Sequence, residues 1–314
     1  MSPRTPLALD PESPESPVSV VVLTRDRRAL LERCLLSVAR LEPAPLEVIV
    51  VDNGSGDGTA DWVGEQFPAV RIIANGDTLG IAGRNRGYRE ARGDFVLSLD
   101  DDVELLDGET LSKVVGAFAD DERAAALSMK IVEEDTHGEF ADHHWWHPRD
   151  RRRWQDARFE TDRINEAAVA FRADVLSEVG YYYEPLFWGG EEWDLVLGIA
   201  DAGYTIHYLP IPALHLSPRG NLNLRRDPRH VLLVRNRFWI AFRRLAWLDA
   251  FAFVLPRAVL WLGRSIRYGY LGHYLSGIGE LAGRAGSILR DRRPIARETQ
   301  RRLQRLRRGD DLSA

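Results

Sequence analysis

The sequence predicts an α/β fold: a mostly parallel, Rossmann-like sheet flanked by helices, with a helical C-terminal extension. Short apolar runs recur at four places in the first hundred residues, as is typical of buried parallel strands. Helical patterns lie between these runs, and that alternation indicates βαβ units. Beyond residue 231 the pattern becomes helical, with aromatic and arginine residues mixed along it. These three observations give the fold class.

Each expected element follows from a local pattern. We expect the first four strands at residues 18–23, 46–51, 70–74 and 95–99, helical segments at 28–41 and 59–67, and a loop that enters a helix at 80–92. Later strands are expected at 124–132, 167–171 and 205–209, and later helices at 111–118, 174–179 and 191–202. Gly203 ends the last of these helices. Residues 136–163 show no clear period.

Three regions follow from this pattern. Residues 1–16 are rich in proline and are predicted to be a disordered leader. Residues 17–239 are predicted to form the α/β domain, and residues 240–314 a helical, Arg-rich C-terminal region.

The composition limits the kinds of protein this can be. Cys34 is the only cysteine, so no intrachain disulfide can form, and the lack of a signal peptide adds to the expectation of a cytoplasmic protein. The net charge of −5 identifies no partner. No uncharged apolar stretch approaches the about 20 residues that span a bilayer. The nearest, residues 240–263, contains three arginines, an aspartate and a proline.

The aromatic and arginine residues of the C-terminal region fit more than one interpretation. They suit peripheral contact with an anionic membrane, at the inner face of the cell membrane, and equally a buried core or a dimer interface. For the arginines of residues 284–308 we favour a solvated helical face, and we expect no nucleic acid partner.

The strand expected at residues 95–99 ends in three aspartates, Asp100, Asp101 and Asp102. Carboxylates should leave a buried strand at its C-terminal edge, which is where open α/β sheets bind ligands. Packed like charges repel unless a cation neutralises them, and hard divalent cations prefer oxygen ligands. The alternative is a solvated acidic turn.

Two glycine-containing loops are candidates for donor binding. Asp52 ends the second strand, and it could bind a ribose or a base with help from Ser55, although such a turn also suits a plain connection. The turn is not the GxGxxG pattern of nicotinamide enzymes. In residues 80–87, Arg84 or Arg86 could pair with phosphate, unless both face solvent.

Acidic, histidine and tryptophan residues give the remaining candidates. Glu191 and Glu192 follow two glycines, and either could act as a general base or simply stabilise the first turn of a helix. His215 could contact a metal or phosphate, or be structural. Contacts to an acceptor could come from three tryptophans, Trp145, Trp146 and Trp188. The His-rich segment around the first two, residues 142–147, could instead hold a metal.

The order of these motifs is more specific than any one of them. The chain contains, in succession, VSVVVLTRDR, VIVVDNGSGDGT, LGIAGRNRGYREARGDFVLSLDDDV and GGEEWDLVLGIADAGY, and then His215 and an Arg-Asn-Arg segment at residues 235–237. Over roughly residues 17–239 it resembles family 2 glycosyltransferases with the GT-A fold, of the type that builds bacterial surface polysaccharides.

The resemblance implies an inverting hexosyl or deoxyhexosyl transfer from a nucleotide-diphosphate sugar to a glycan or lipid-linked acceptor, with Mg²⁺ or Mn²⁺. Thr24 and Asp52 would contact the nucleoside, and Arg84 and Asn85 would lie near the ribose or diphosphate. The resemblance also implies roles for the acidic strand end: Asp100 faces the ribose or metal-bound water, Asp102 and His215 hold the metal, and Asp101 is a bystander.

Glu192 matches the position of the family's catalytic base, which is commonly an aspartate. Because glutamate is longer, Glu191 or Asp194 are alternatives for that role, and Glu191 is also a candidate acceptor contact. Two other functions compete. A sugar-nucleotide pyrophosphorylase has a glycine-rich basic loop after the first strand, which VSVVVLTRDR lacks. A non-catalytic nucleotide- or glycan-binding module would not need Asp100, Asp102 and Glu192.

Overall fold

The computed structural model describes residues 16–133, 145–216 and 227–308. Nearly all of the expected leader, and residues 142–144 of the His-rich segment, lie outside the described residues.

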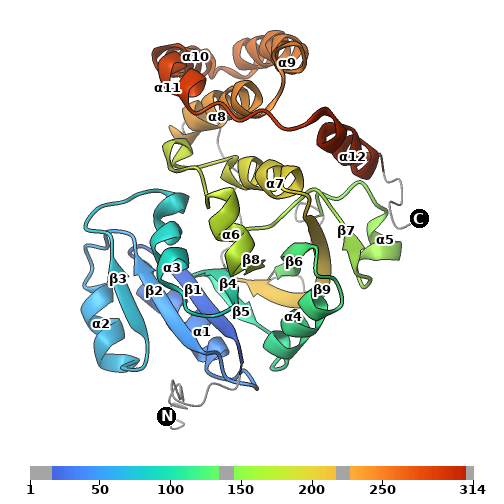
Figure 1. Cartoon of the computed structure of the whole chain (residues 1–314). Helices are drawn as coiled ribbons and strands as arrows, with labels where there is room; N and C mark the ends of the chain where they lie inside the picture. The colour runs from blue at the N-terminus through green and yellow to red at the C-terminus, as the bar shows by residue number, and fades with distance from the viewer. Residues whose placement is uncertain (1–15, 134–144, 217–226, 309–314) are drawn as a thin grey trace.

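A nine-stranded mixed sheet forms the centre of the molecule (Figure 1), in the order β3-β2-β1-β4-β8-β6-β9-β5, with β7 paired to β9. The strands are β1 Val18–Thr24, β2 Glu47–Asp52, β3 Arg71–Ala74, β4 Phe95–Asp100, β5 Val103–Leu105, β6 Ala124–Glu133, β7 Phe159–Glu160, β8 Ala168–Arg172 and β9 Thr205–His215. The first four run parallel to one another. β8 is antiparallel to both β4 and β6, and β9 is parallel to β6. The α/β fold class is confirmed, with the parallel arrangement concentrated in β1 to β4.

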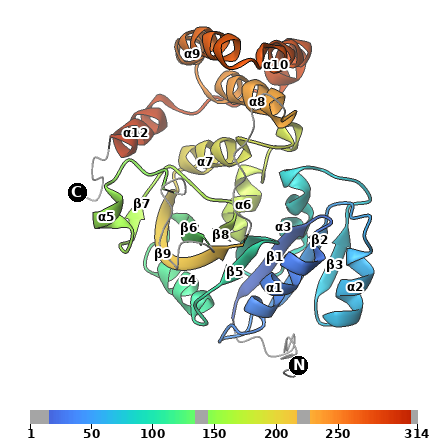
Figure 2. The ribbon, with the colours of Figure 1, turned by 180° about the vertical axis from the view of Figure 1, so that it is seen from behind.

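Helices cover both faces of this sheet (Figures 1 and 2). They are α1 Arg28–Val38, α2 Thr59–Gln66, α3 Asn85–Glu90, α4 Thr110–Ala119, α5 Arg151–Trp154, α6 Ala173–Val179 and α7 Glu191–Asp201. Successive strand residues point to opposite faces. Val20 and Val50 therefore pack with α1, α2 and α4, whereas Val21 and Ile49 pack with α3, α6 and α7.

The C-terminal extension is helical, as expected. It comprises α8 Arg229–Arg244, α9 Trp247–Tyr268, α10 Leu271–Gly283, α11 Ala285–Arg290 and α12 Arg297–Arg307. In both views α8, α9 and α10 stack beyond α7, on the side away from the sheet (Figures 1 and 2). Phe238 and Trp239 are fully buried in the apolar cluster that joins these helices to Leu197 of α7. α8 runs through residue 240, where we expect the C-terminal region to begin, so the two regions share one helix.

Candidate active site

The ends of β1, β2 and β4 bring polar residues to one edge of the sheet. Thr24 lies opposite Asp52 in the β1–β2 register, and Leu23 lies opposite Asp100 in the β1–β4 register. This is the carboxyl edge of the parallel strands, where ligands bind in such sheets. Asp52 is buried, and its Oδ1 accepts a hydrogen bond of 2.9 Å from the N–H of Ser55. The turn after β2 is thus held by its own aspartate.

Arg27 is the cation among the aspartates. Its Nη1 lies 3.2 Å from Asp101 Oδ1 and 2.8 Å from Asp102 Oδ2. Thr24 Oγ1 donates a hydrogen bond of 2.8 Å to Asp101 Oδ2. Burial raises the pKa of Asp101 to about 6, against the opposing effect of Arg27. Asp101, the expected bystander, therefore holds Thr24 and Arg27 in place. Contact between Thr24 and a nucleoside stays a prediction.

Asp102 and His215 meet although they are far apart in the sequence. β9 continues beyond its expected end at residue 209 and reaches His215, because it pairs with β5 as well as β6. His215 Nε2 lies 3.6 Å from Asp102 Oδ1. A carboxylate oxygen and an imidazole nitrogen at this separation fit neighbouring positions around a divalent cation such as Mn²⁺.

Arg84 and Asn85 are fully buried where the short 3-10 turn Ile81–Arg84 enters α3. Arg84 Nη2 donates to Asp100 Oδ1 at 2.5 Å, and its Nη1 donates to Ser98 Oγ at 3.1 Å. Asn85 Nδ2 donates to the carbonyl of Tyr182 at 2.8 Å, and Asn85 Oδ1 accepts from the N–H of the same residue at 3.1 Å. The structure assigns these two residues partners within the protein: Arg84 positions Asp100, and Asn85 holds the chain at Tyr182.

The loop that leads into α7 is clamped by α8. Gly189 and Gly190 have φ values of +88° and +96°, which favour glycine. Asn236 Nδ2 donates to the carbonyl of Gly189 at 2.7 Å and reaches two further loop carbonyls at 2.9 Å. Arg235 Nη2 donates to the same loop, at the carbonyl of Leu186, at 2.8 Å. The Arg-Asn-Arg segment therefore fixes the loop that carries the two glutamates of α7.

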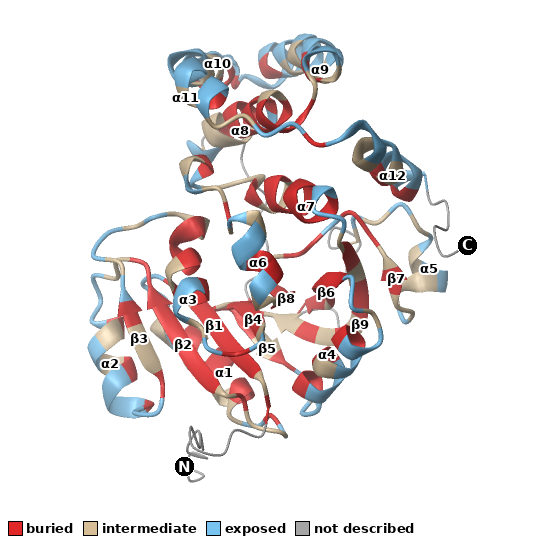
Figure 3. Cartoon of the chain, in the orientation of Figure 1, coloured by how far each residue is buried: buried red, intermediate tan, exposed pale blue. Residues whose placement is uncertain are grey.

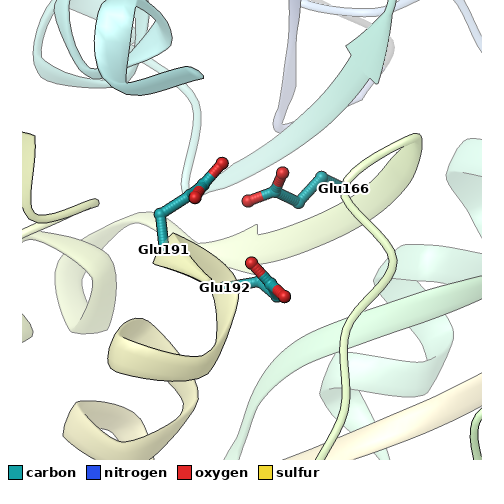
Figure 4. A group of neighbouring side chains, drawn as sticks. All are labelled: Glu166, Glu191 and Glu192. Carbon is teal, nitrogen blue, oxygen red and sulfur yellow. The ribbon is translucent and has the colours of Figure 1, made fainter. Parts of the chain in front are cut away.

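Three glutamates point toward one another at the start of α7 (Figure 4). One carboxylate oxygen of each of Glu166, Glu191 and Glu192 lies within 4.8 Å of the others. Burial, and then the neighbouring Glu192, raise the pKa of Glu191 to about 8. Burial also raises the pKa of Glu192, and burial together with the two neighbours raises that of Glu166. Three carboxylates this close cannot all be ionised unless a cation joins them, so the cluster retains a proton at neutral pH in the absence of one.

A cleft of about 610 Å³ unites these groups. Among its lining residues are Arg27, Asp100, Asp102, Trp146, Glu166, Trp188, Glu191, Glu192, His215, Arg229 and Leu233. Trp188 carries the guanidinium of Arg229 over its ring, at 4.9 Å from the ring centre. The structure thus brings together the expected metal, base and acceptor residues, and places Thr24, Asp52 and Ser55 at the neighbouring strand ends, outside the lining.

Trp145 does not line this cleft. Its ring packs edge-on against Phe159 and Tyr208, and its Nε1 donates to the carbonyl of Arg149 at 2.7 Å. It belongs to an aromatic cluster beside β7 and β9. Trp146 is the tryptophan of this pair that reaches the cleft.

Arg27, Glu166 and Arg229 are site residues that the sequence analysis misses. Glu166 had a detectable pattern, since it is a charged residue directly before the buried strand expected at 167–171. Arg27 lies in the polar loop after the first strand, at the same sheet edge as Asp52.

Comparison with known proteins places the chain in a family. The family model "Glycosyl transferase family 2" matches residues 19–180, just over half of the chain. That range runs from β1 to the end of α6 and includes Asp52, Asp100, Asp102 and Glu166.

Curated relatives are similar over part of their length. The PGL/p-HBAD biosynthesis glycosyltransferase of Mycobacterium bovis is 27% identical over 201 residues, which are 62% of this chain and 71% of the relative. The GalNAc(5)-diNAcBac-PP-undecaprenol beta-1,3-glucosyltransferase of Campylobacter jejuni is 36% identical over 96 residues, which are 29% of this chain and 31% of the relative.

A solved structure is similar over nearly the whole chain. The mannosyltransferase PcManGT from Pyrobaculum calidifontis, in complex with GDP-Man and Mn²⁺, matches with a TM-score of 0.57 at 22% identity, over 96% of this chain and 86% of that one. This likeness concerns the fold, and it agrees with the expected GT-A architecture and its helical extension.

Proposed function

Since the chain belongs to glycosyl transferase family 2 and is thus a glycosyltransferase, we propose that it moves a hexosyl or deoxyhexosyl group, with inversion, from a nucleotide-diphosphate sugar to a hydroxyl of a glycan or lipid-linked acceptor. The observation that carries this proposal is the single cleft lined by Asp100, Asp102, His215 and the glutamates of α7. Membership of this family favours the proposal over a pyrophosphorylase or a non-catalytic binding module.

On the donor side, the nucleoside would lie along the ends of β1 and β2, near Thr24 and Asp52, with Ser55 beside them. Asp100 is held by Arg84 at the rim of the cleft, where its free oxygen can accept a hydrogen bond from a ribose hydroxyl. Arg84 would act through Asp100, because its own side chain is completely buried.

Asp102 and His215 fit a divalent cation, Mn²⁺ or Mg²⁺, through the oxygen and nitrogen atoms that lie 3.6 Å apart. When bound there, the cation supplies positive charge that stabilises the departing nucleoside diphosphate. Arg27 adds a second positive charge at the same carboxylate, 2.8 Å from Asp102 Oδ2.

On the acceptor side, Glu192 is the proposed general base. The acceptor oxygen forms a bond to the anomeric carbon while the bond from that carbon to the diphosphate breaks, and Glu192 takes the hydroxyl proton. The N–H of Gly190 donates to Glu192 Oε2 at 3.1 Å and so directs the carboxylate. Burial raises the pKa of Glu192 and so its affinity for the proton, against the opposing effect of Arg237 and Arg163. Glu191 is the alternative base.

Trp146 and Trp188 are the proposed acceptor contacts, since both line the cleft with aromatic surface on which a sugar ring can stack. The Campylobacter relative is named for a substrate linked to PP-undecaprenol, and the Mycobacterium relative for PGL/p-HBAD biosynthesis. These names support a lipid-linked acceptor and a role in building cell-envelope glycans.

The test is a screen of nucleotide sugars by thermal shift with and without Mn²⁺, followed by transfer assays with the donor that stabilises the protein most. We expect Mn²⁺-dependent stabilisation that Asp102→Asn abolishes, and a product whose anomeric configuration, measured by NMR, is opposite to that of the donor. A product that retains the donor configuration would refute the inverting mechanism. Equal donor binding by wild type and Asp102→Asn would refute the metal assignment.

A further inference from the structure

α9 is apolar on both sides, although only one side is covered. Its inner side packs on α8, where Ala250 and Val254 are buried and Trp261 stacks on Phe238. Its outer side is open: Leu248 is 80% exposed and Val259 73% exposed. A helix that is apolar all round normally has its whole surface covered, so the outer side requires an occupant.

Six of the exposed apolar residues form one straight stripe, which we call the outer face of α9. It consists of Leu248, Phe251, Leu255, Val259, Leu262 and Ile266. Their spacing follows the 3.6-residue period of a straight α-helix and not the 3.5-residue repeat that makes helices coil around each other. A straight stripe suits a flat surface better than a long partner helix.

The outer face is the main apolar surface of the described residues. Nine of the sixteen large apolar side chains that are exposed there belong to α9, and Leu271 and Leu275 of the neighbouring α10 are two more. Figure 3 shows this exposure at the end of the molecule, farthest from the sheet. Contiguous exposed apolar surface of this kind marks an interaction site.

Charge indicates what covers it. Residues 247–293, which include α9 to α11, contain seven arginines and three acidic residues, a formal charge of +4, which leaves −9 for the rest of the chain. Arg264 and Arg267 are also exposed on the same helix. An anionic surface therefore attracts this end of the molecule and repels the other, whereas a second copy brings like charge against like at this face.

We infer that the outer face of α9 binds the surface of an anionic lipid bilayer and so presents the cleft to a lipid-linked acceptor; this second half rests on the proposed function. α8 connects the two sites. Its first turns contribute Arg229 and Leu233 to the cleft, and α9 and α10 pack against the same helix. Among the described residues, no helix has both the length and the apolarity to span a membrane.

The experiment is flotation of the full chain with vesicles of phosphatidylcholine alone and of phosphatidylcholine mixed with phosphatidylglycerol. We expect the protein to bind the mixed vesicles and to bind the neutral vesicles much more weakly. Binding to the mixed vesicles should decrease as the salt concentration is raised, because salt screens the charge of the arginines. Failure to bind the mixed vesicles at low salt overturns the inference.

A matched pair of variants tests the surface itself. Leu255 is 60% exposed on the outer face, and Leu106, in the loop after β5, is 49% exposed at the sheet. Leu255→Glu should reduce vesicle affinity at least about tenfold, since it places a charge where an apolar side chain is buried on binding. Leu106→Glu should leave vesicle affinity unchanged. Equal affinities of the two variants contradict the inference, provided that thermal unfolding shows both to be folded.

Two further readouts separate this inference from its rivals. Glu192→Gln should bind vesicles as wild type does while losing turnover, so vesicle binding and the proposed function can fail independently. Sedimentation velocity without lipid should show a monomer. A dimer that Leu255→Glu dissociates would mean that a second copy covers the outer face, and would overturn the membrane assignment.

Discussion

The crowding of like charges determines the proton affinity of single residues in the cleft. Glu166, Glu191 and Glu192 come within 4.8 Å of one another, and burial adds to the cost of ionising them. Arg27 does the opposite at the other acidic group, where it lies between Asp101 and Asp102. Near the cleft, one set of acids retains a proton and the other pairs with Arg27, which suits proton transfer at the first and anion or metal binding at the second.

Glu192→Gln should lower the turnover number by about 10²–10⁴-fold, because the amide cannot accept the acceptor's proton. Affinity for the nucleotide sugar should stay within a few-fold of wild type, since Glu192 acts on the acceptor side. Steady-state kinetics and isothermal titration with the donor measure the two quantities. Glu191→Gln is the matched control. If Glu191→Gln loses about 10²–10⁴-fold in turnover number and Glu192→Gln remains active, Glu191 is the base.

Glu191 should make the folded protein less stable as pH rises. Its pKa is about 8 in the folded state, against an ordinary value of 4.5, because of burial and the nearby Glu192. Between these pH values the unfolded chain releases the proton and the folded protein keeps it, so the contribution to stability falls with pH and levels off above 8. Glu191→Gln should therefore raise the melting temperature relative to wild type at pH 8 and have little effect at pH 4.

That prediction is measured by thermal unfolding across this pH range, with Glu184→Gln as the control. Glu184 is an exposed acid whose pKa is lowered by the side chain of Arg89, so its replacement should not stabilise the protein at pH 8. If the difference in melting temperature between wild type and Glu191→Gln does not change with pH, Glu191 is not buried in a proton-retaining state.

Strand-end residues such as Asp52 and Asp100 could be predicted from the sequence because a charge after an apolar run is a local pattern. The clustering of Glu166 with Glu191 and Glu192 could not be predicted, because these residues meet only through the packing of α7 against the sheet. The burial of Arg84 was equally hidden. In the sequence, Arg84 stands among small residues, which is also typical of a phosphate-binding arginine. The structure shows that its partner is Asp100, at 2.5 Å.

At the scale of secondary structure elements, α8 organises the site without contributing a reacting group. Asn236 and Arg235 hold the loop before α7, and Arg243 and Arg244 both pair with Asp194, the fourth residue of α7. Both ion pairs are buried, at 2.6 and 2.8 Å. The orientation of the helix that carries the glutamates thus depends on a helix outside the range of the family model.

Asp194→Asn should destabilise the protein by about 3–5 kcal/mol, because it leaves two buried arginines without a counter-charge. The melting temperature should fall by about 5–15 °C, as measured by calorimetry. Asp156→Asn is the control, since the side chain of Asp156 is 75% exposed and pairs with Lys130 at the surface. Loss of that pair should change stability by no more than about 1 kcal/mol. Equal effects of the two substitutions would refute the structural role of Asp194.

The elements themselves could be predicted where they are long and periodic, as in β1, β2, β4 and α7. The directions of the later strands could not be predicted, because an apolar run such as that of β8 is compatible with both parallel and antiparallel neighbours. Short pieces were missed for a related reason: β5 and β7 have three and two residues, too few for an alternating pattern to emerge.

At the scale of the whole molecule, the division at residue 240 does not separate two independent folding units. Phe238 and Trp239 are fully buried, and Trp261 of α9 stacks on Phe238. The arginines that neutralise Asp194 also come after residue 239. The expected glycosyltransferase domain therefore depends on the helical extension for charge balance and for covering its apolar end.

A chain that stops after residue 239 should consequently lose the native fold. Removal of Arg243 and Arg244 lowers the free energy of unfolding by about 3–5 kcal/mol. Exposure of the two large aromatic side chains lowers it by about 1.5–3 kcal/mol each. The sum approaches or exceeds the whole free energy of unfolding of such proteins, about 5–15 kcal/mol. Calorimetry of this chain should show no cooperative transition at the temperature of the full chain.

A chain that stops after residue 308 keeps α8 to α12 and should melt like the full chain. If the chain ending at 239 unfolds as cooperatively and at the same temperature as the full chain, the extension is an appendage, and the clamp on α7 does not require it.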